Sequence, residues 1–212
     1  NGITTDVTGN IYVTGYYAGT VDFDPGPGIT SLSAVAGSDF FVSKFSPSGN
    51  YIWTKTIGGA NTDYAYAITS DVFSNLYIAG DFTSDSVDMD PGAGMYMIYN
   101  SVFTGTQAEG FVLALDSAGS FLWSNNMKGM ASDYVRSVCV SHNQEIIVGG
   151  YFSTSIDLDP AGSVASNGSS DAYLASFNTG GTFNWLRTFG GGGADYLYSA
   201  SVSGDYILAT GT

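Results

Sequence analysis

The 212-residue sequence contains a single cysteine and very few basic residues. The one thiol, Cys139, excludes an internal disulfide, so packing alone must stabilise the fold. Five lysine and arginine residues against 19 acidic residues give a formal net charge of -14. Nucleic acids and anionic membrane surfaces are therefore excluded as partners, because binding them requires basic residues that neutralise phosphate groups.

Long hydrophobic runs are absent as well, since no stretch reaches the roughly 18 apolar residues needed to span a bilayer. We therefore expect no membrane insertion. The sequence starts at Asn1 with neither an initiator methionine nor a signal peptide, and we expect a mature or trimmed piece of a protein. Charged residues make up only 11% of the chain and hydrophobic residues 44%, so the chain is predicted to be globular rather than disordered.

An internal repeat is the dominant feature that the sequence does contain. Trp53, Trp123 and Trp185 mark equivalent positions, which gives a unit of roughly 60 to 70 residues. The pattern that opens each unit occurs four times, at residues 3–15, 68–80, 138–149 and 201–211. Only three of these four copies are followed by the rest of the unit.

Each unit is predicted to consist of β-strands. Apolar residues alternate with polar or small ones over short runs, and Gly, Asn, Asp, Ser or Pro stands between the runs. Tight turns at 46–50, 116–120 and 178–182 connect the third strand to the strand that carries the tryptophan. The chain is therefore predicted to be all-β, with four antiparallel strands per unit and an insertion between the second and third, which is typical of β-propeller blades.

The predicted organisation is one propeller segment with three full blade repeats and part of a fourth, divided at residues 1–65, 66–135, 136–198 and 199–212. Three blades and a part are too few to close a ring, because propellers use about 4 to 8 blades. We expect that the remaining blades of a longer chain, or other copies of this chain in a multimer or filament, pair with the open edges.

The ordered motifs of the first unit resemble a known family. They are Asp-Val-x-Gly-Asn-Ile-Tyr-Val-Thr-Gly, Asp-Phe-Asp-Pro-Gly-Pro-Gly and Asp-Phe-Phe-Val-Ser-Lys-Phe-Ser-Pro-Ser-Gly-Asn-Tyr-Ile-Trp. In this order, over nearly the whole chain, they look like the secreted β-propeller repeat family of bacteria, especially Bacteroidetes, often exported by the type IX secretion route. The resemblance implies an extracellular or cell-surface module of a larger secreted protein, with a function that is usually structural, adhesive or unknown.

Each complete unit also carries an Asp-x-Asp-Pro motif, at Asp22 and Asp24, Asp88 and Asp90, and Asp157 and Asp159. Side chains two residues apart on a strand project to one face, so each pair is a candidate ligand set for Ca²⁺. Ca²⁺ takes about 6 to 8 oxygen ligands, however, and Asp before Pro is also a common turn former. Both interpretations stay open at this point, and the first implies an alternative function as a Ca²⁺-dependent, lectin-like propeller that binds a glycan or another ligand.

The insertion of the second unit is longer and more apolar than its counterparts. Its residues Met95, Tyr96, Met97 and Tyr99 are a candidate contact surface for a protein partner. The alternative is that this insertion covers the edge of its own blade.

Other conspicuous residues are assigned to the scaffold. We predict that the three tryptophans pack between blades, and that Asp63, Asp133 and Asp195 accept backbone N–H groups at the turns between blades. His142 is the only histidine, and one histidine with one cysteine makes neither a zinc site nor an activated nucleophile. The Asp pairs could in principle act as the acid and base of a glycosidase, but an active site should not occur in three copies. No enzymatic activity is therefore predicted.

Overall fold

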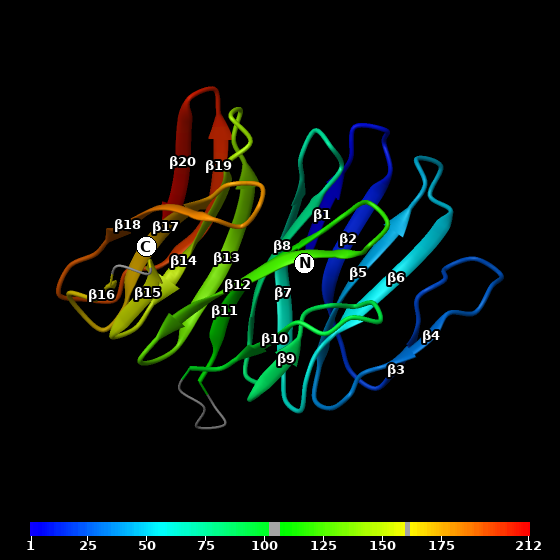
Figure 1. Cartoon of the computed structure of the whole chain (residues 1–212), viewed down its shortest axis with the longest axis horizontal. Helices are drawn as coiled ribbons and strands as arrows, with labels where there is room; N and C mark the ends of the chain where they lie inside the picture. Colours follow the sequence, from blue (N-terminus) through cyan, green and yellow to red (C-terminus); the bar gives the residue numbers. More distant parts are fainter. Residues whose placement is uncertain (102–106, 160–161) are drawn as a thin grey trace.

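The computed structural model describes residues 1–101, 107–159 and 162–212, and every regular element in these ranges is a β-strand. The sheets stand side by side, from the N-terminal sheet (blue and cyan) on the right to the C-terminal strands (red) on the left (Figure 1). This arrangement confirms the prediction of an all-β chain built from propeller blades. The described part of the chain contains no helix that is long and apolar enough to cross a membrane.

Three sheets have a core of four antiparallel strands, and a two-stranded sheet follows them. The first sheet consists of β1 (Gly2–Thr5), β2 (Ile11–Tyr17), β5 (Asp39–Phe45) and β6 (Tyr51–Ile57). The second contains β7 (Asp63–Ser70), β8 (Leu76–Phe82), β11 (Glu109–Leu115) and β12 (Phe121–Gly129). The third contains β13 (Asp133–Val140), β14 (Ile146–Phe152), β17 (Asp171–Phe177) and β18 (Phe183–Phe189), and the last contains β19 (Leu197–Ser203) and β20 (Tyr206–Gly211). Strands β7 and β13 start slightly ahead of the repeat divisions expected after residues 65 and 135.

A short hairpin is inserted between the second and third strands of each complete blade. The hairpins are β3 (Thr20–Asp22) with β4 (Ser31–Ser33), β9 (Ser86–Asp88) with β10 (Met97–Tyr99), and β15 (Ser155–Asp159) with β16 (Gly162–Ala165). The third hairpin differs from the others because β15 pairs with β12 of the preceding blade, through Lys128 and Gly129. The second sheet therefore has six strands.

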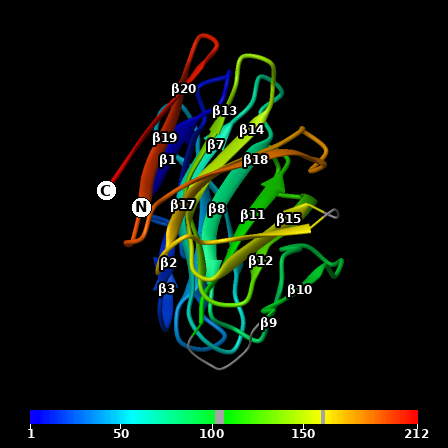
Figure 2. The ribbon, with the colours of Figure 1, turned by 90° about the vertical axis from the view of Figure 1, so that its left-hand side faces the viewer.

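The first strands of consecutive blades lie next to one another, and we call them the inner strands. Strands β1, β7, β13 and β19 contact one another in this order, and Figure 2 shows them on the side opposite the inserted hairpins β9–β10 and β15–β16. Consecutive blades are also joined by parallel bridges, between Ser38 and Thr62 and between Ser170 and Ala194.

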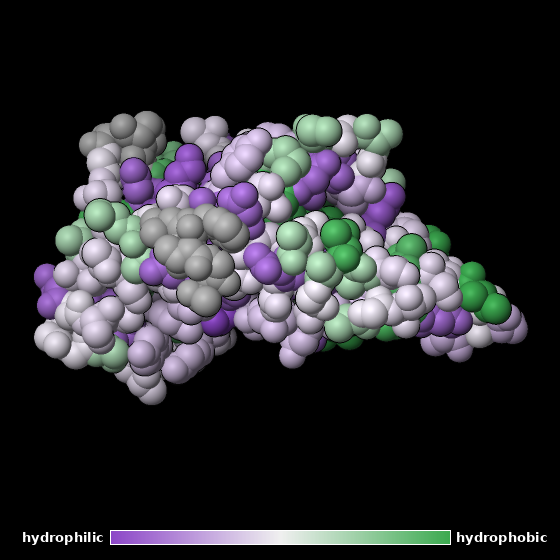
Figure 3. All heavy atoms as spheres, turned by 90° about the horizontal axis from the view of Figure 1, so that it is seen from below, coloured by the Kyte–Doolittle hydropathy of each residue, from purple (hydrophilic) through white to green (hydrophobic). Residues whose placement is uncertain are grey.

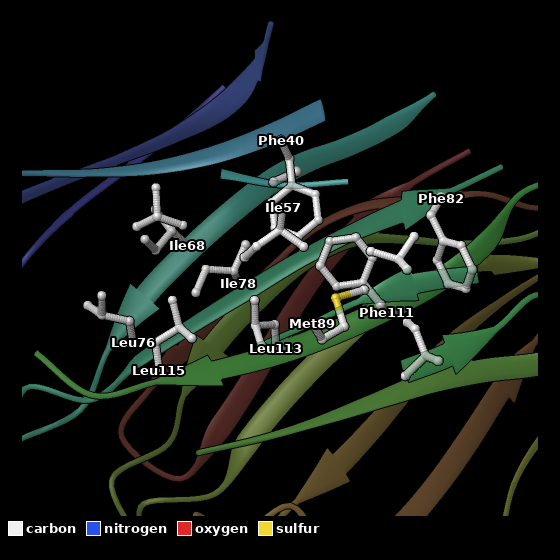
Figure 4. Close-up of a cluster of buried hydrophobic side chains, with 14 of the residues drawn as sticks. Phe40, Ile57, Ile68, Leu76, Ile78, Phe82, Met89, Phe111, Leu113 and Leu115 are labelled. Carbon is white, nitrogen blue, oxygen red and sulfur yellow. The ribbon is translucent and has the colours of Figure 1, made fainter. Parts of the chain in front are cut away.

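Hydrophobic cores fill the spaces between consecutive blades. Between the first two blades, Phe40 stacks on Phe111 at a ring-centroid distance of 4.8 Å. Figure 4 shows that the side chains of both blades point into this cluster, which also includes Met89 from the inserted hairpin. Burying such aromatic and aliphatic side chains is the dominant stabilising contribution in this fold.

The tryptophans pack between blades, as predicted. Trp53 lies against the core between the first and second blades, and Trp185 against the core that includes β19 residues. Trp123 donates a hydrogen bond from Nε1 to the carbonyl of Thr179, in the last turn of the following blade, at 2.8 Å. Each tryptophan thereby links its own outer strand to the neighbouring blade.

Candidate functional site

The Asp-x-Asp-Pro loops are closed by their own carboxylates. In the first blade, Oδ1 of Asp22 accepts the N–H of Asp24 at 3.1 Å and that of Thr30 at 2.8 Å. Oδ1 of Asp24 accepts the N–H of Gly26 at 2.8 Å. The second blade repeats these bonds, with Asp88 accepting from Asp90 and Tyr96, and Asp90 accepting from Gly92. In these two loops the carboxylates define the backbone path.

In each of these two loops, the residue between the two aspartates packs against apolar side chains, and this packing requires a fixed backbone path. Met89 is fully buried in the core between the first and second blades, and its counterpart Phe23 lies 5.0 Å from the rings of Tyr17 and Phe41. The loop thus delivers an apolar side chain to a blade face. In the third hairpin Asp157 is exposed opposite Lys128, and the side chain of Asp159 lies outside the described part of the structure.

Chelation is expected to leave the stability of the protein unchanged. The described residues contain no group of three or more His, Cys, Asp or Glu side chains placed to hold a metal ion, and in the first two loops one oxygen of each aspartate accepts backbone N–H groups. Addition of EDTA should therefore shift the melting temperature by less than about 1 °C in differential scanning fluorimetry. A rise on adding Ca²⁺ that disappears in the Asp22→Asn/Asp24→Asn variant would instead assign a cation to the loop.

The apolar insertion of the second blade is divided between two roles. Tyr96 covers its own blade, since its ring lies 4.7 Å from that of Phe121 and its hydroxyl donates to the carbonyl of Ser124 at 3.1 Å. Met95 and Tyr99 are 78% and 64% exposed, and Met97 is half-buried. Tyr96 is itself 41% exposed, so Met95, Tyr96 and Tyr99 are the exposed members of the predicted contact surface, and its use by a partner stays a prediction.

His142 and Cys139 do not form a reactive site. His142 lines an open cavity of about 500 Å³ at the ends of the inner strands, together with Asp6 and Asp71. Both aspartates are engaged in their own turns, where each accepts two backbone N–H groups, an asparagine amide and a tyrosine hydroxyl. Burial raises the pKa of Cys139 to about 11, so the thiol is protonated and unreactive at neutral pH.

A row of aromatic side chains that sequence reasoning missed crosses the start of the inner strands. We call it the tyrosine ribbon. Its ring contacts run from Tyr16 to Tyr64 at 4.3 Å, from Tyr134 to Tyr151 at 4.7 Å, and from Tyr151 to Tyr196 at 4.6 Å. The full set is Tyr16, Tyr64, Tyr66, Tyr134, Arg136, Tyr151, Tyr196 and Tyr198. It therefore extends over all four repeats.

β-Bulges place three members of the ribbon. Tyr66, Arg136 and Tyr198 are the extra residues at register shifts in β7, β13 and β19. A bulge re-aims a side chain at the cost of a local kink. Glycine on the neighbouring strand makes this kink sterically feasible, because a Cβ on Gly150 would lie 1.8 Å from the carbonyl oxygen of Tyr134. Gly80 stands in the same relation to Tyr64.

Arg136 joins the two halves of the ribbon. Its guanidinium carbon lies 4.1 Å from the ring centroid of Tyr66, 4.7 Å from that of Tyr134 and 5.5 Å from that of Tyr151. Its Nη1 contacts Oδ2 of Asp81 at 2.7 Å, and the two side chains are 18% and 4% exposed. Burial raises the pKa of Asp81 to about 6, although Arg136 opposes this shift. The rings at the two ends, Tyr16 and Tyr198, are about half exposed.

Carboxylates lie directly before the ribbon tyrosines at each blade junction. Asp63 accepts the N–H of Gly59 at 2.7 Å, and Asp195 accepts that of Gly191 at 2.9 Å, so the predicted turn role is confirmed for both. The prediction is wrong for Asp133, whose two carboxylate oxygens have no hydrogen-bond partner among the described residues.

The third hairpin accounts for the difference at Asp133. Gly129, the counterpart of Gly59, belongs to β12 and pairs with Ile156 of β15, and its N–H points to Oγ of Ser101 at 3.4 Å. Burial, with a smaller contribution from the Glu109 carboxylate, raises the pKa of Asp133 to about 9. Asp133 is therefore protonated at neutral pH.

The comparison with curated proteins supports a propeller-like repeat. The chain is 23% identical, over 212 residues, to an uncharacterized WD repeat-containing protein of Acanthamoeba polyphaga mimivirus. The match covers 89% of this chain and only 15% of the length of that protein. No protein-family model matches the chain. WD repeats form four-stranded propeller blades, in agreement with the sheets described above, whereas the bacterial family and the export route stay predictions.

Proposed function

We propose that this chain is a non-catalytic β-propeller interaction module, and that the tyrosine ribbon is the surface at which it binds a partner. One observation carries this proposal: aromatic side chains from four repeats, with one arginine, form a single contiguous and partly exposed row. Tyrosine and arginine are enriched among the residues that dominate binding energy at interfaces. The ribbon is also held on strands, which fix its geometry better than loops.

The uses of the carboxylates support a non-catalytic role. Asp6 and Asp71 fold turns, Asp22 and Asp24 fold a hairpin loop, and Asp81 neutralises Arg136. A general acid or base must reach a substrate proton, whereas these side chains are occupied by the scaffold. The repeated acidic motifs are thus explained without a reaction.

The open face of the first blade supports a role in a larger assembly. Val13, Phe23, Phe41 and Phe45 line a groove of about 300 Å³ on it. Their counterparts in the second blade, Ile78, Met89, Phe111 and Leu115, are all fully buried against the first blade. In Figure 3 green residues are scattered over a mostly pale or purple surface, with several at the end that carries the first sheet. A further blade, from a longer chain or from another copy, fits this face.

We place this assembly outside the cell, as a structural or adhesive part of a larger secreted protein. The placement rests on the sequence resemblance to secreted bacterial propeller repeats. The strongly acidic surface is compatible with it, because a net charge of -14 keeps a protein soluble.

A peptide-selection experiment tests the binding role of the ribbon. Two matched variants remove two exposed aromatic side chains each: the ribbon variant Tyr16→Ser/Tyr198→Ser and the control variant Phe73→Ser/Tyr206→Ser. Peptides selected on the wild-type chain from a random phage-displayed library should bind the ribbon variant at least about tenfold more weakly. They should bind the control variant equally well. Selected peptides that bind all three proteins equally would place the interaction surface elsewhere.

A further inference from the structure

We infer that the tyrosine ribbon recognises a basic segment of a polypeptide, and that lysine or arginine side chains of this segment lie over the exposed tyrosine rings. The inference rests on the proposed function and specifies the chemistry of its partner. Three observations carry it: the way in which Arg136 is held, the distribution of charge over the strands, and the exposure of the rings at both ends of the ribbon.

Arg136 already makes, within the protein, the contact between a cation and tyrosine rings that we infer for the basic side chains of the partner. Its guanidinium lies within 5.5 Å of three ribbon rings, and its Nη2 donates to the hydroxyl of Tyr151 at 3.3 Å. The face of a tyrosine ring carries partial negative charge, which attracts a cation placed over it. Burial alone would lower the pKa of Arg136, but the Asp81 carboxylate together with Tyr151 and Tyr66 outweighs this effect, and the pKa is raised. The ribbon therefore already stabilises one charged guanidinium group.

The charge distribution favours further cations at the ribbon. Arg136 is the only one of the five basic residues on an inner strand, and the other four lie on third and fourth strands, namely Lys44, Lys55, Lys128 and Arg187. Acidic residues begin several strands at the ribbon end, including Asp39, Asp63, Glu109 and Asp171. Together with the net charge of -14, this arrangement attracts a positively charged segment and repels an acidic one.

The rings at the two ends of the ribbon are only half covered by the described residues. Tyr16 and Tyr198 are 49% and 52% exposed, while Arg136 lies over rings in the middle of the row. An extended peptide rises about 3.3 Å per residue, with alternate side chains on one face. Basic side chains two or more residues apart can therefore contact successive rings along the row.

Fluorescence anisotropy with short labelled peptides tests the inference. The probes are a Gly-Arg-Gly-Arg-Gly-Arg-Gly peptide, its counterpart with glutamate in place of arginine, and the neutral oligosaccharide maltohexaose as an unlabelled competitor. We expect the arginine peptide to bind the wild-type chain and the control variant with equal affinity. The ribbon variant should bind it at least about tenfold more weakly, because two stacking surfaces are lost. The glutamate peptide should not bind.

Each other outcome contradicts the inference in a distinct way. Equal binding of the arginine peptide to the ribbon and control variants would mean attraction to net charge alone, since both variants keep the charge of the wild type. Displacement of the arginine peptide by maltohexaose would indicate a glycan site instead. If ribbon-dependent peptides emerge from the random library but carry no basic residues, the proposed function stands and this inference fails.

Discussion

The Asp133→Asn variant is expected to melt at a higher temperature than the wild-type chain at pH 7. Asp133 is fully buried, neither oxygen has a hydrogen-bond partner among the described residues, and its pKa is raised from 3.8 to about 9. At pH 7 the unfolded chain loses this proton and the folded chain keeps it, so the wild type is penalised by up to about 4 kcal/mol. Asparagine is neutral in both states. The gain should be about 5 to 10 °C in a thermal melt.

The same residue gives the stability of the protein a definite pH dependence. Because the folded pKa is raised, the contribution of Asp133 is fully present below about pH 4 and is lost as the pH rises toward 9. The slope should be at most about 1.4 kcal/mol per pH unit in urea titrations. Wild type and variant should therefore be similar at pH 3.5 and diverge above pH 5.

Asp195 is the matched control for this prediction. It occupies the equivalent position at the next blade junction, but its carboxylate accepts the N–H of Gly191. Asp195→Asn should therefore bring no gain in melting temperature. A lower melting temperature for Asp133→Asn at pH 7 would mean that the Asp133 carboxylate is ionised and bound in the native protein.

Replacement of Arg136 by methionine should cause the largest loss of stability among the substitutions considered. Methionine keeps an apolar stem between the tyrosine rings but leaves Asp81, which is 4% exposed, without its cation. Breaking a buried ion pair on one side typically costs 3 to 5 kcal/mol, or about 10 °C in melting temperature for a chain of this size. The double variant Asp81→Asn/Arg136→Met should recover most of this loss, because no uncompensated charge is then buried.

Urea denaturation of the four proteins in this double-mutant cycle measures the coupling. Arg187→Met is the control, since the Arg187 guanidinium is exposed and donates to the carbonyl of its neighbour Leu186. A change within about 0.5 kcal/mol is expected there. If Arg136→Met were as stable as the wild type, the ribbon would not depend on this ion pair.

The fold was predictable because the residue patterns of strands and turns are present within each unit. The same patterns recur in every complete unit, which supports the strand prediction. The tryptophan positions were predictable for the same reason. The tyrosine ribbon was not, because Tyr64 and Tyr66 look like ordinary residues of an alternating strand. The bulge that re-aims Tyr66 depends on Gly80 of the next strand. The available signal was the recurrence of Asp-Tyr at three junctions, each paired with a glycine one strand later.

The predicted carboxylate sites show that a repeated motif does not determine the environment of each of its side chains. Asp22 and Asp24 were candidates for Ca²⁺ because side chains two residues apart on a strand project to one face, but each finds backbone N–H donors only once the loop has folded. Asp133 has the same sequence context as Asp63 and a different environment. The cause is the pairing of β15 with β12, a contact that no local pattern encodes.

That pairing also sets the order in which the blades can separate. The first and last blade junctions are held by side-chain packing and one isolated bridge each, and they can open without breaking a sheet. Between the second and third blades, a hairpin that belongs to one blade supplies strands to the sheet of the other. These two blades should therefore exchange their amide hydrogens as one cooperative unit, while the first blade opens independently and at lower free energy.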